Sequence, residues 1–432
     1  MERGATASVP CDILDLALAD SGRRRIDWAS LTMPVLRTVR KRFIKEQPFE
    51  GVRIAASLHV TAETANLMIT LRDGGASPVL CASNALSTQD DVAAALVRDF
   101  HIPVYAIRGA SAEACTEHRN LTLQGEPMLL MDSGGDLGAH WMSSFQASAP
   151  VPVGVVEETA SGASRYNALA RASTLPFPVV AADDGRTRNL FDNRYGTGQS
   201  TFDSIIRITG MLVAGTTVVI AGYGACGRGV AARARGLGAT AIVTETDPIH
   251  ALEALMDGCR VMPTSEAAAL GDIFVTVTGN RNVVGREIFD RLKDGAYLCN
   301  AGHSNVEIDV PTLHRVAQSS REAREFVHEF KMKDGRRICL LAEGRIINLA
   351  AAEGHPASVM DIGFATEALS ADYLLRSKDS LARSVYPVPE DIDRQVAKMK
   401  LESMGVSMDK LTIEQEQYLG RVEVLQHHVN NV

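Results

Sequence analysis

The sequence lacks two features that would place it at a membrane or on nucleic acid: a long apolar run and an excess of positive charge. Its 432 residues include 44 Lys and Arg against 52 Asp and Glu, which gives a net charge of −8. No apolar run approaches the about 18 residues that a membrane-spanning helix needs, and the N-terminus lacks the basic-then-apolar pattern of a signal peptide. We therefore expect no membrane and no nucleic acid among its partners.

Cysteine is scarce and scattered. The seven cysteines are an odd number, and none forms a CxxC pair or joins histidines at zinc-binding spacing. The stretch Asp132–Asp136 has a glycine turn between two acids, but it lacks the further acidic ligands that a metal ion needs. The sequence therefore predicts reduced thiols in a cytoplasmic protein and no metal site.

A glycine-rich stretch organises the chain. The apolar run Val218–Ile220 reads as a buried strand, and it leads into Gly222-x-Gly224-x-x-Gly227, a helical segment, a second apolar run and Glu245. Strand, glycine turn, helix, strand and acid are the order of a dinucleotide-binding unit, in which the helix N-terminus faces a pyrophosphate. Glu245 can accept hydrogen bonds from a ribose diol and would repel a 2′-phosphate, which favours NAD over NADP. The alternative is a glycine-rich turn with no ligand.

Elsewhere strands and helices alternate, which predicts an α/β fold. A polar connector at 183–188 and a second crossing at 354–356 bracket the glycine-rich unit. We expect a discontinuous α/β substrate-binding domain, an inserted Rossmann NAD-binding domain and a helical C-terminal segment, with a ligand cleft between the two domains. The expected boundaries are 1–190 with 352–400 for the first, 191–351 for the second and 401–432 for the third.

Polar residues gather where the expected strands stop. In an open parallel sheet these ends face the ligand crevice, so they are candidates for chemistry. Each also has a plainer interpretation, because such residues serve as helix caps, loops, turns or hinges. The candidates are His59, Asp132, Ser133, Glu157, Glu158, Asp192, Asn193, His303 and His355.

Taken together, these stretches resemble the adenosylhomocysteinase family, in its short archaeal-type branch. The resemblance runs from about residue 10 to Gly420 and keeps the order of the family's motifs. The matching pieces are 57–64 (SLHVTAET), 83–90 (SNALSTQD), 134–136 (GGD), 157–159 (EET), 191–196 (FDNRYG), the glycine loop, 300–303 (NAGH), 306–309 (VEID), 341–345 (LAEGR), 348–349 (NL), 354–356 (GHP), 411–412 (LT) and 417–420 (QYLG).

The resemblance implies a chemistry. Tightly bound NAD transiently oxidises the 3′-hydroxyl of an adenine nucleoside, which acidifies the proton at C4′. A base removes that proton, and the group at C5′ leaves by elimination. Water then adds at C5′ and the 3′-ketone is reduced again. For the family this sequence amounts to reversible hydrolysis of S-adenosyl-L-homocysteine to adenosine and homocysteine.

The resemblance also implies roles for individual residues. The catalytic positions are His59, Ser133, Glu158, Arg188, Asp192 and His303. The adenosine pocket is lined by Thr61, Glu63, His355 and Met360. Contacts to NAD come from Thr159, Ser161, Asn193, Gly222, Gly224, Gly227, Glu245, Asn280 and Asn348. The family is usually tetrameric, so we expect a homotetramer or a homodimer.

Two departures fall on catalytic positions. Arg188 stands where the family pattern has a lysine, and arginine cannot act as a base because it is effectively never deprotonated. Ser133 stands where the family has an acid that partners His59. We therefore predict a repurposed enzyme, a nucleoside dehydratase that forms a 4′,5′-unsaturated nucleoside, as in formation of a decoyinine- or angustmycin-like antibiotic. The alternatives are ordinary hydrolysis of S-adenosyl-L-homocysteine and a non-catalytic protein that binds NAD and nucleoside.

A third departure lies in the tail. Residues 422–432 lack the Lys- and Tyr-containing end that in many family members reaches a neighbour's NAD site. The archaeal-type branch lacks that end as well, so this departure indicates only subfamily character.

Overall fold

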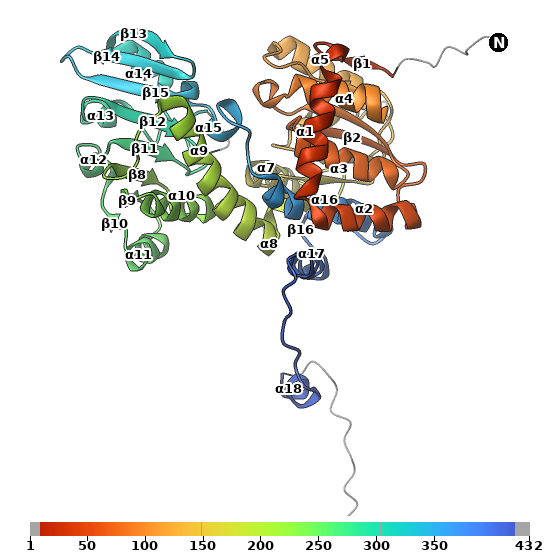
Figure 1. Cartoon of the computed structure of the whole chain (residues 1–432). Coiled ribbons are helices and arrows are strands. Elements are labelled where there is room, and N and C mark those ends of the chain that lie inside the picture. Colours follow the sequence, from red (N-terminus) through yellow and green to blue (C-terminus); the bar gives the residue numbers. More distant parts are fainter. Residues whose placement is uncertain (1–8, 148, 303–304, 420–432) are drawn as a thin grey trace, which may run out of the picture.

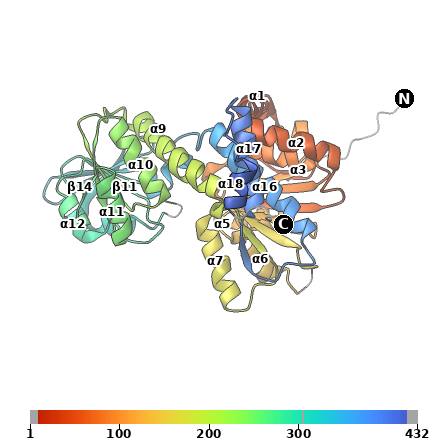
Figure 2. The same cartoon turned by 90° about the horizontal axis from the view of Figure 1, so that it is seen from below.

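Two eight-stranded sheets, each covered by helices, form the two bodies of the molecule (Figure 1). The computed structural model describes residues 9–147, 149–302 and 305–419. Among these residues, no helix is long and apolar enough to cross a membrane. The two bodies remain distinct when the molecule is seen from below, with α9 (Thr197–Thr209) running between them (Figure 2).

The first sheet is parallel and has the strand order β1-β4-β3-β2-β5-β6-β7-β16. Its central strands are buried on both faces, as a parallel sheet between helix layers requires. The strands are β1 (Cys11–Asp12), β2 (Arg53–Leu58), β3 (Ser77–Ala82), β4 (Val104–Tyr105), β5 (Leu129–Asp132), β6 (Gly154–Glu157), β7 (Val179–Ala181) and β16 (Val385–Pro387). The helices are η1 (Leu16–Leu18), α1 (Ala19–Leu31), α2 (Pro34–Glu46), α3 (Ala62–Asp73), η2 (Ala85–Ser87), α4 (Asp90–Phe100), α5 (Ala112–Leu123), α6 (Asp136–Ser144) and α7 (Ala160–Arg171).

The second sheet has the order β10-β9-β8-β11-β12-β15-β14-β13. Its first six strands are parallel and follow the Rossmann order, with the glycine turn after the central strand. The strands are β8 (Thr217–Ala221), β9 (Thr240–Thr244), β10 (Arg260–Val261), β11 (Ile273–Thr276), β12 (Ala296–Asn300), β13 (Ala317–Arg324), β14 (Val327–Met332) and β15 (Arg337–Leu341). The helices are α10 (Ala225–Gly236), α11 (Pro248–Met256), α12 (Thr264–Ala267), α13 (Arg286–Phe289) and α14 (Val310–Val316).

The chain crosses between the bodies twice, which confirms the expected discontinuous fold. It leaves the first sheet through short helical turns and re-enters after the second sheet, and β16 then pairs with β7 to complete the first sheet. The first crossing consists of η3 (Ala182–Asp184), α8 (Arg186–Arg188), the π-helix η4 (Asn189–Gly196) and α9. The return consists of η5 (Ala342–Gly344), α15 (Ile347–Ala350) and α16 (Ala357–Arg376).

The C-terminal part is helical in two separate pieces. Helix α17 (Glu390–Ser403) packs against α16 and α2, so the expected boundary at 401 falls in its last turn. Helix α18 (Ile413–Tyr418) follows a non-helical stretch and stands apart from both bodies (Figure 1). The exact domain boundaries stay predictions.

Candidate active site

A cavity of about 490 Å³ lies between the two bodies. It is lined by the ends of strands from both sheets and by both crossings, which is where an open α/β sheet places its ligand. Residues from widely separated parts of the chain meet here. Those predicted from the sequence are His59, Thr61, Glu63, Glu158, Thr159, Ser161, Arg188, Asp192, Asn193, Asn348, His355 and Met360.

His59 lines the cavity just after β2, and a hydrogen bond with Ser87 fixes its tautomer. The Nδ1 of His59 lies 2.6 Å from Oγ of Ser87. The Ser87 hydroxyl donates its single proton to the carbonyl of Asn84 at 2.8 Å, so it must accept from His59. His59 therefore carries its proton on Nδ1 when neutral, and Nε2 holds the lone pair that a general base uses.

Arg188 also lines the cavity, where it lies among three carboxylates. Its Nη1 bonds to Oε1 of Glu367 at 2.5 Å, its Nη2 lies 3.3 Å from Oε1 of Glu158, and its Nε lies 3.3 Å from Oδ2 of Asp192. All four side chains are less than a tenth exposed. Asp192 also bonds to Nδ1 of His355. The residue at 188 is thus a fixed cation inside an acidic cluster.

The charges of this cluster set its protonation. Burial would raise the pKa of Asp192, but the charge and hydrogen bond of His355 and the charge of Arg188 bring it to about 2. Burial and then the charge of Glu158 raise the pKa of Glu367 to about 8. Burial would lower the pKa of Arg188, but the three carboxylates outweigh it and raise that pKa further. Asp192 is therefore ionised and is a weak proton acceptor by itself.

Ser133 does not line the cavity. It is 3% exposed in the turn after β5, and its Oγ has no hydrogen-bond partner among the described residues. Its neighbour Asp132 accepts from the backbone N–H groups of Leu137 and Gly138 and from the hydroxyl of Tyr166. The acid of this turn is thus occupied in holding helix α6, and Ser133 adds no charge beside it.

The glycine turn has the shape that a dinucleotide needs. A side chain at Gly227 would place its Cβ 2.0 Å from the carbonyl oxygen of Gly222, so the helix can pack on the strand only with glycine there. At Gly224 a Cβ would meet nothing within 4 Å, which leaves space over the N-terminus of α10. Glu245 follows β9. Its Oε2 accepts the backbone N–H of Tyr223 at 2.7 Å and its Oε1 accepts those of Thr246 and Asp247 at 2.6 and 3.1 Å, so Oε2 keeps a further acceptor site.

Another buried acid, Glu307, holds the loop that follows β11. It is fully buried, and it accepts from the backbone N–H and hydroxyl of Thr278 and from the N–H of Gly279 at 2.7–2.9 Å. Thr278 and Gly279 line the cavity from the nucleotide side. This loop, the glycine turn and Glu245 together fit an adenine dinucleotide.

Several predicted residues lie outside the cavity lining. Gly222 and Gly224 precede α10, and Gly227 lies in its first turn next to Cys226, which does line the cavity. Asn280 is exposed beyond Gly279, and its side chain accepts the N–H of Arg281. His303 falls outside the described residues.

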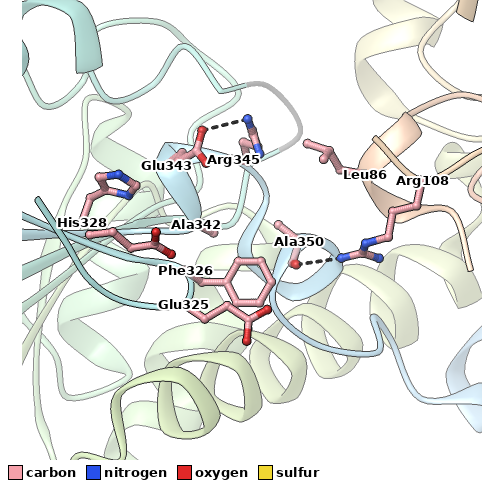
Figure 3. Close-up of a pocket in the computed structure, with 10 residues that line it drawn as sticks. Leu86, Arg108, Glu325, Phe326, His328, Ala342, Glu343, Arg345 and Ala350 are labelled. Carbon is pink, nitrogen blue, oxygen red and sulfur yellow. Dashed lines mark hydrogen bonds and ion pairs between the residues drawn. The ribbon is translucent and has the colours of Figure 1, made fainter. Parts of the chain in front are cut away.

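A second, smaller cavity of about 140 Å³ also lies between the bodies. Figure 3 shows Leu86 and Arg108 on one side of it, and Phe326 and His328 from the β14 region on the other. Arg108 reaches across to the carbonyl of Ala350 at 3.5 Å. None of the described residues that the sequence predicted lines this cavity, so the larger one is the candidate active site.

The sequence did not identify four residues that shape the site. Ser87, Glu307 and Cys226 lie inside or beside motifs of the chain, yet nothing in their spacing assigns them a role. Glu367 lies within the largely apolar helix α16, where the only available signal is that it is one of three acids, with Asp361 and Asp372. A buried acid on an otherwise apolar helix face indicates a cationic partner.

Two family models match the chain. One, described as S-adenosyl-L-homocysteine hydrolase, NAD binding domain, matches residues 193–354, and the other, described as S-adenosyl-L-homocysteine hydrolase, matches residues 10–153. The solved dipicolinate synthase A chain from Bacillus subtilis is 13% identical, covers 77% of this chain and 98% of its own, and has a TM-score of 0.44.

Closer relatives span nearly the whole chain, and each is named Adenosylhomocysteinase. The one from Aquifex aeolicus is 55% identical over 413 residues, which cover 96% of this chain and 99% of the relative. The one from Thermosynechococcus vestitus is 52% identical and covers 96% of both. The one from Thermococcus kodakarensis is 51% identical and covers 94% of this chain and 96% of the relative. The chain belongs to the adenosylhomocysteinase family of NAD-dependent enzymes.

Proposed function

We propose that this protein catalyses the reversible hydrolysis of S-adenosyl-L-homocysteine to adenosine and homocysteine. The observation that carries the proposal is a single cavity that is lined by His59 together with Arg188, Asp192 and His355. The names of the relatives favour this reaction over the dehydration expected from the sequence.

Bound NAD supplies reversible oxidation of the ribose 3′-hydroxyl. The chain itself binds and orients the ribose. We assign this task to Glu158, whose Oε2 is buried and has no hydrogen-bond partner among the described residues. A buried, unpaired carboxylate oxygen favours a ligand hydroxyl that donates to it.

Proton transfer divides between two groups of residues that line the cavity. At the C5′ end, Nε2 of His59 takes the proton from an attacking water or returns it to the leaving sulfur. At the ribose end, Asp192 is held ionised and orients His355 through Nδ1. We propose that the Asp192–His355 pair, rather than Asp192 alone, manages the proton near C4′, because the two side chains are hydrogen-bonded to each other and both line the cavity.

A second function is favoured by two residues. Arg188 is a permanent cation, and Ser133 supplies a hydroxyl where the family pattern has an acid. Both changes weaken the addition of water at C5′ while leaving the groups that orient the ribose. If a C5′-side hydroxyl leaves as water and no water returns, the product is a 4′,5′-unsaturated nucleoside.

The two functions differ in their products. The protein is incubated with S-adenosyl-L-homocysteine, and separately with a ketohexose-type adenine nucleoside, and the products are identified by mass spectrometry. Release of homocysteine supports hydrolysis. A product lighter by one water, without homocysteine, would replace hydrolysis with dehydration. Bound NAD that no adenine nucleoside reduces would refute both and favour a non-catalytic protein.

The double variant Arg188→Lys with Ser133→Asp sharpens the assignment. If the protein is a hydrolase as it stands, the variant changes homocysteine release by less than about tenfold, because the remaining site already completes the reaction. A gain of hydrolysis from none would mark the dehydratase.

We further propose a cytoplasmic homotetramer or homodimer. The seven cysteines are all free, and α18 carries exposed apolar side chains, including Ile413 at 70% and Tyr418 at 91%. A second copy would cover such a surface. Light scattering of the purified protein tests the assembly, and a monomer at micromolar concentration would contradict it.

A further inference from the structure

Glu367 is the partner that Arg188 contacts most closely, yet it is not one of the described residues that line the cavity. The 2.5 Å contact from Nη1 to Glu367 is shorter than the 3.3 Å contacts to Glu158 and Asp192. Glu158, Asp192 and Arg188 all line the cavity. Glu367 therefore lies behind the guanidinium, away from the space for a ligand.

Helix α16 is built to receive the guanidinium. Gly363 lies one turn before Glu367, and a Cβ there would lie 3.7 Å from the guanidinium carbon of Arg188. Residues four apart share one face of a helix. On this face of α16, Gly363 leaves space for the guanidinium of Arg188 and Glu367 supplies a carboxylate to pair with it. The side chain of Glu367 is 1% exposed, and its Oε2 has no hydrogen-bond partner among the described residues.

We propose that Glu367 is a positioning residue that draws Arg188 toward α16 and so keeps Glu158 and Asp192 open to the hydroxyls of an adenine nucleoside. A guanidinium has five N–H donors in a fixed fork, and it can saturate whichever carboxylates it faces. Without a charge behind it, Arg188 moves onto the two acids that face the cavity. This inference rests on the proposed function, because it names the nucleoside of that site.

The proposal implies a dependence on pH. The charged and titratable groups packed around the guanidinium are Glu158 after β6, Asp183 in η3, Asp192 in η4, His355 in the return crossing and Glu367 in α16. Asp192 is ionised throughout the neutral range because its pKa is about 2. As the pH rises through the pKa of Glu367, at about 8, the carboxylate behind Arg188 gains its charge and the cavity-facing acids are released.

The test compares adenosine binding to the NAD-loaded wild type, Glu367→Gln and a matched control, Asp372→Asn. Glutamine keeps the shape and the neutral state of Glu367. Asp372 is another buried acid of α16, paired with Arg42 and Arg376 outside the cavity. Dissociation constants are measured by titration calorimetry from about pH 6 to about pH 9, with thermal unfolding recorded for each variant.

At about pH 9 the Glu367→Gln protein is expected to bind adenosine about tenfold more weakly than wild type, the effect of about one charged hydrogen bond. At about pH 6 the dissociation constants of the two proteins are expected to agree within about twofold, because wild-type Glu367 is then protonated. Asp372→Asn is expected to unfold at a lower temperature and to bind like wild type at every pH.

The outcomes separate this inference from the proposed function. A wild type that neither binds adenosine nor reduces its NAD would refute the proposed function. A wild type that does both, beside a Glu367→Gln protein with the same affinity and the same pH profile, would refute the role of Glu367 alone. Equally weakened adenosine binding in Asp372→Asn would also refute it, since the loss of affinity would then follow from lower stability of the fold.

Discussion

The two bodies anchor their ligand loops in the same way and then build different sites in front of the anchor. In the first, Glu157 at the end of β6 accepts the N–H groups of Gly134, Gly135 and Thr159 at 2.8–3.0 Å. In the second, Glu307 holds the loop after β11 through Thr278 and Gly279. Each acid is fully buried, so each loop is fixed to its sheet by a carboxylate with no contact to solvent.

The difference lies in what each anchor supports. On the nucleotide side the groups that face the cavity are small and uncharged, such as Cys226, Thr278 and Gly279. On the nucleoside side they include charged side chains that follow β6 and that lie in the two crossings, with Glu367 of α16 behind them. The glycine turn needs a close approach of backbone to backbone and tolerates no side chain at Gly227. The cluster around Arg188 depends instead on the balance between its positive and negative charges.

The largest expected effect is on NAD binding at the glycine turn of the second body. Gly227→Ala should lower NAD affinity by more than about 100-fold, because its Cβ would lie 2.0 Å from a backbone oxygen and push α10 off its strand. Gly236→Ala is the matched control on the same helix, where a Cβ meets nothing within 4 Å. NAD content after gel filtration measures both. A Gly227→Ala protein that keeps its NAD would show that the nucleotide side does not depend on close backbone approach.

This contrast also explains what the sequence could predict. The nucleotide turn from Val218 to Glu245 is contiguous, so its order of strand, glycines, helix and acid identifies it directly. Glu367 lies 179 residues from Arg188, and Ser87 lies 28 residues from His59. Such pairs follow from tertiary packing, which no local pattern encodes, so the members of the charged cluster could be listed but their contacts could not.

The sequence also missed the hairpin of β13 and β14. Strand β13 is exposed along nearly its whole length and is rich in Arg, Glu and Ser, so it lacks the apolar alternation by which a half-buried strand is identified. Its pairing with β14 is antiparallel at the edge of the sheet, where a charged strand protects against further pairing.

The two anchors themselves offer the next test. Glu307→Gln and Glu157→Gln should each cost about 3 kcal/mol of unfolding free energy, since each places an amide NH₂ against backbone donors. Glu307→Gln should also release NAD at least about tenfold more readily than Glu157→Gln. Denaturant unfolding and retained NAD measure the pair. Equal NAD loss in both variants would contradict the assignment of each anchor to its own ligand.

The smallest effect is expected for two acids whose pKa is lowered to about 2, namely buried Asp192 in the first crossing and exposed Asp294 in the second body. A lowered pKa adds stability that is present above the unfolded value, near 4, and is lost as the pH falls through about 2. For Asp192 this contribution is about 2 kcal/mol, and Asp192→Asn removes it. Asp294 pairs with Arg337 in solvent, so the effect of Asp294→Asn should vanish in about 1 M salt. Unfolding by urea between about pH 2 and pH 6 at low and high salt measures both. If salt also abolished the loss of stability in Asp192→Asn, the acidic cluster would be open to solvent. The contrast between a buried charged cluster and an exposed ion pair would then be wrong.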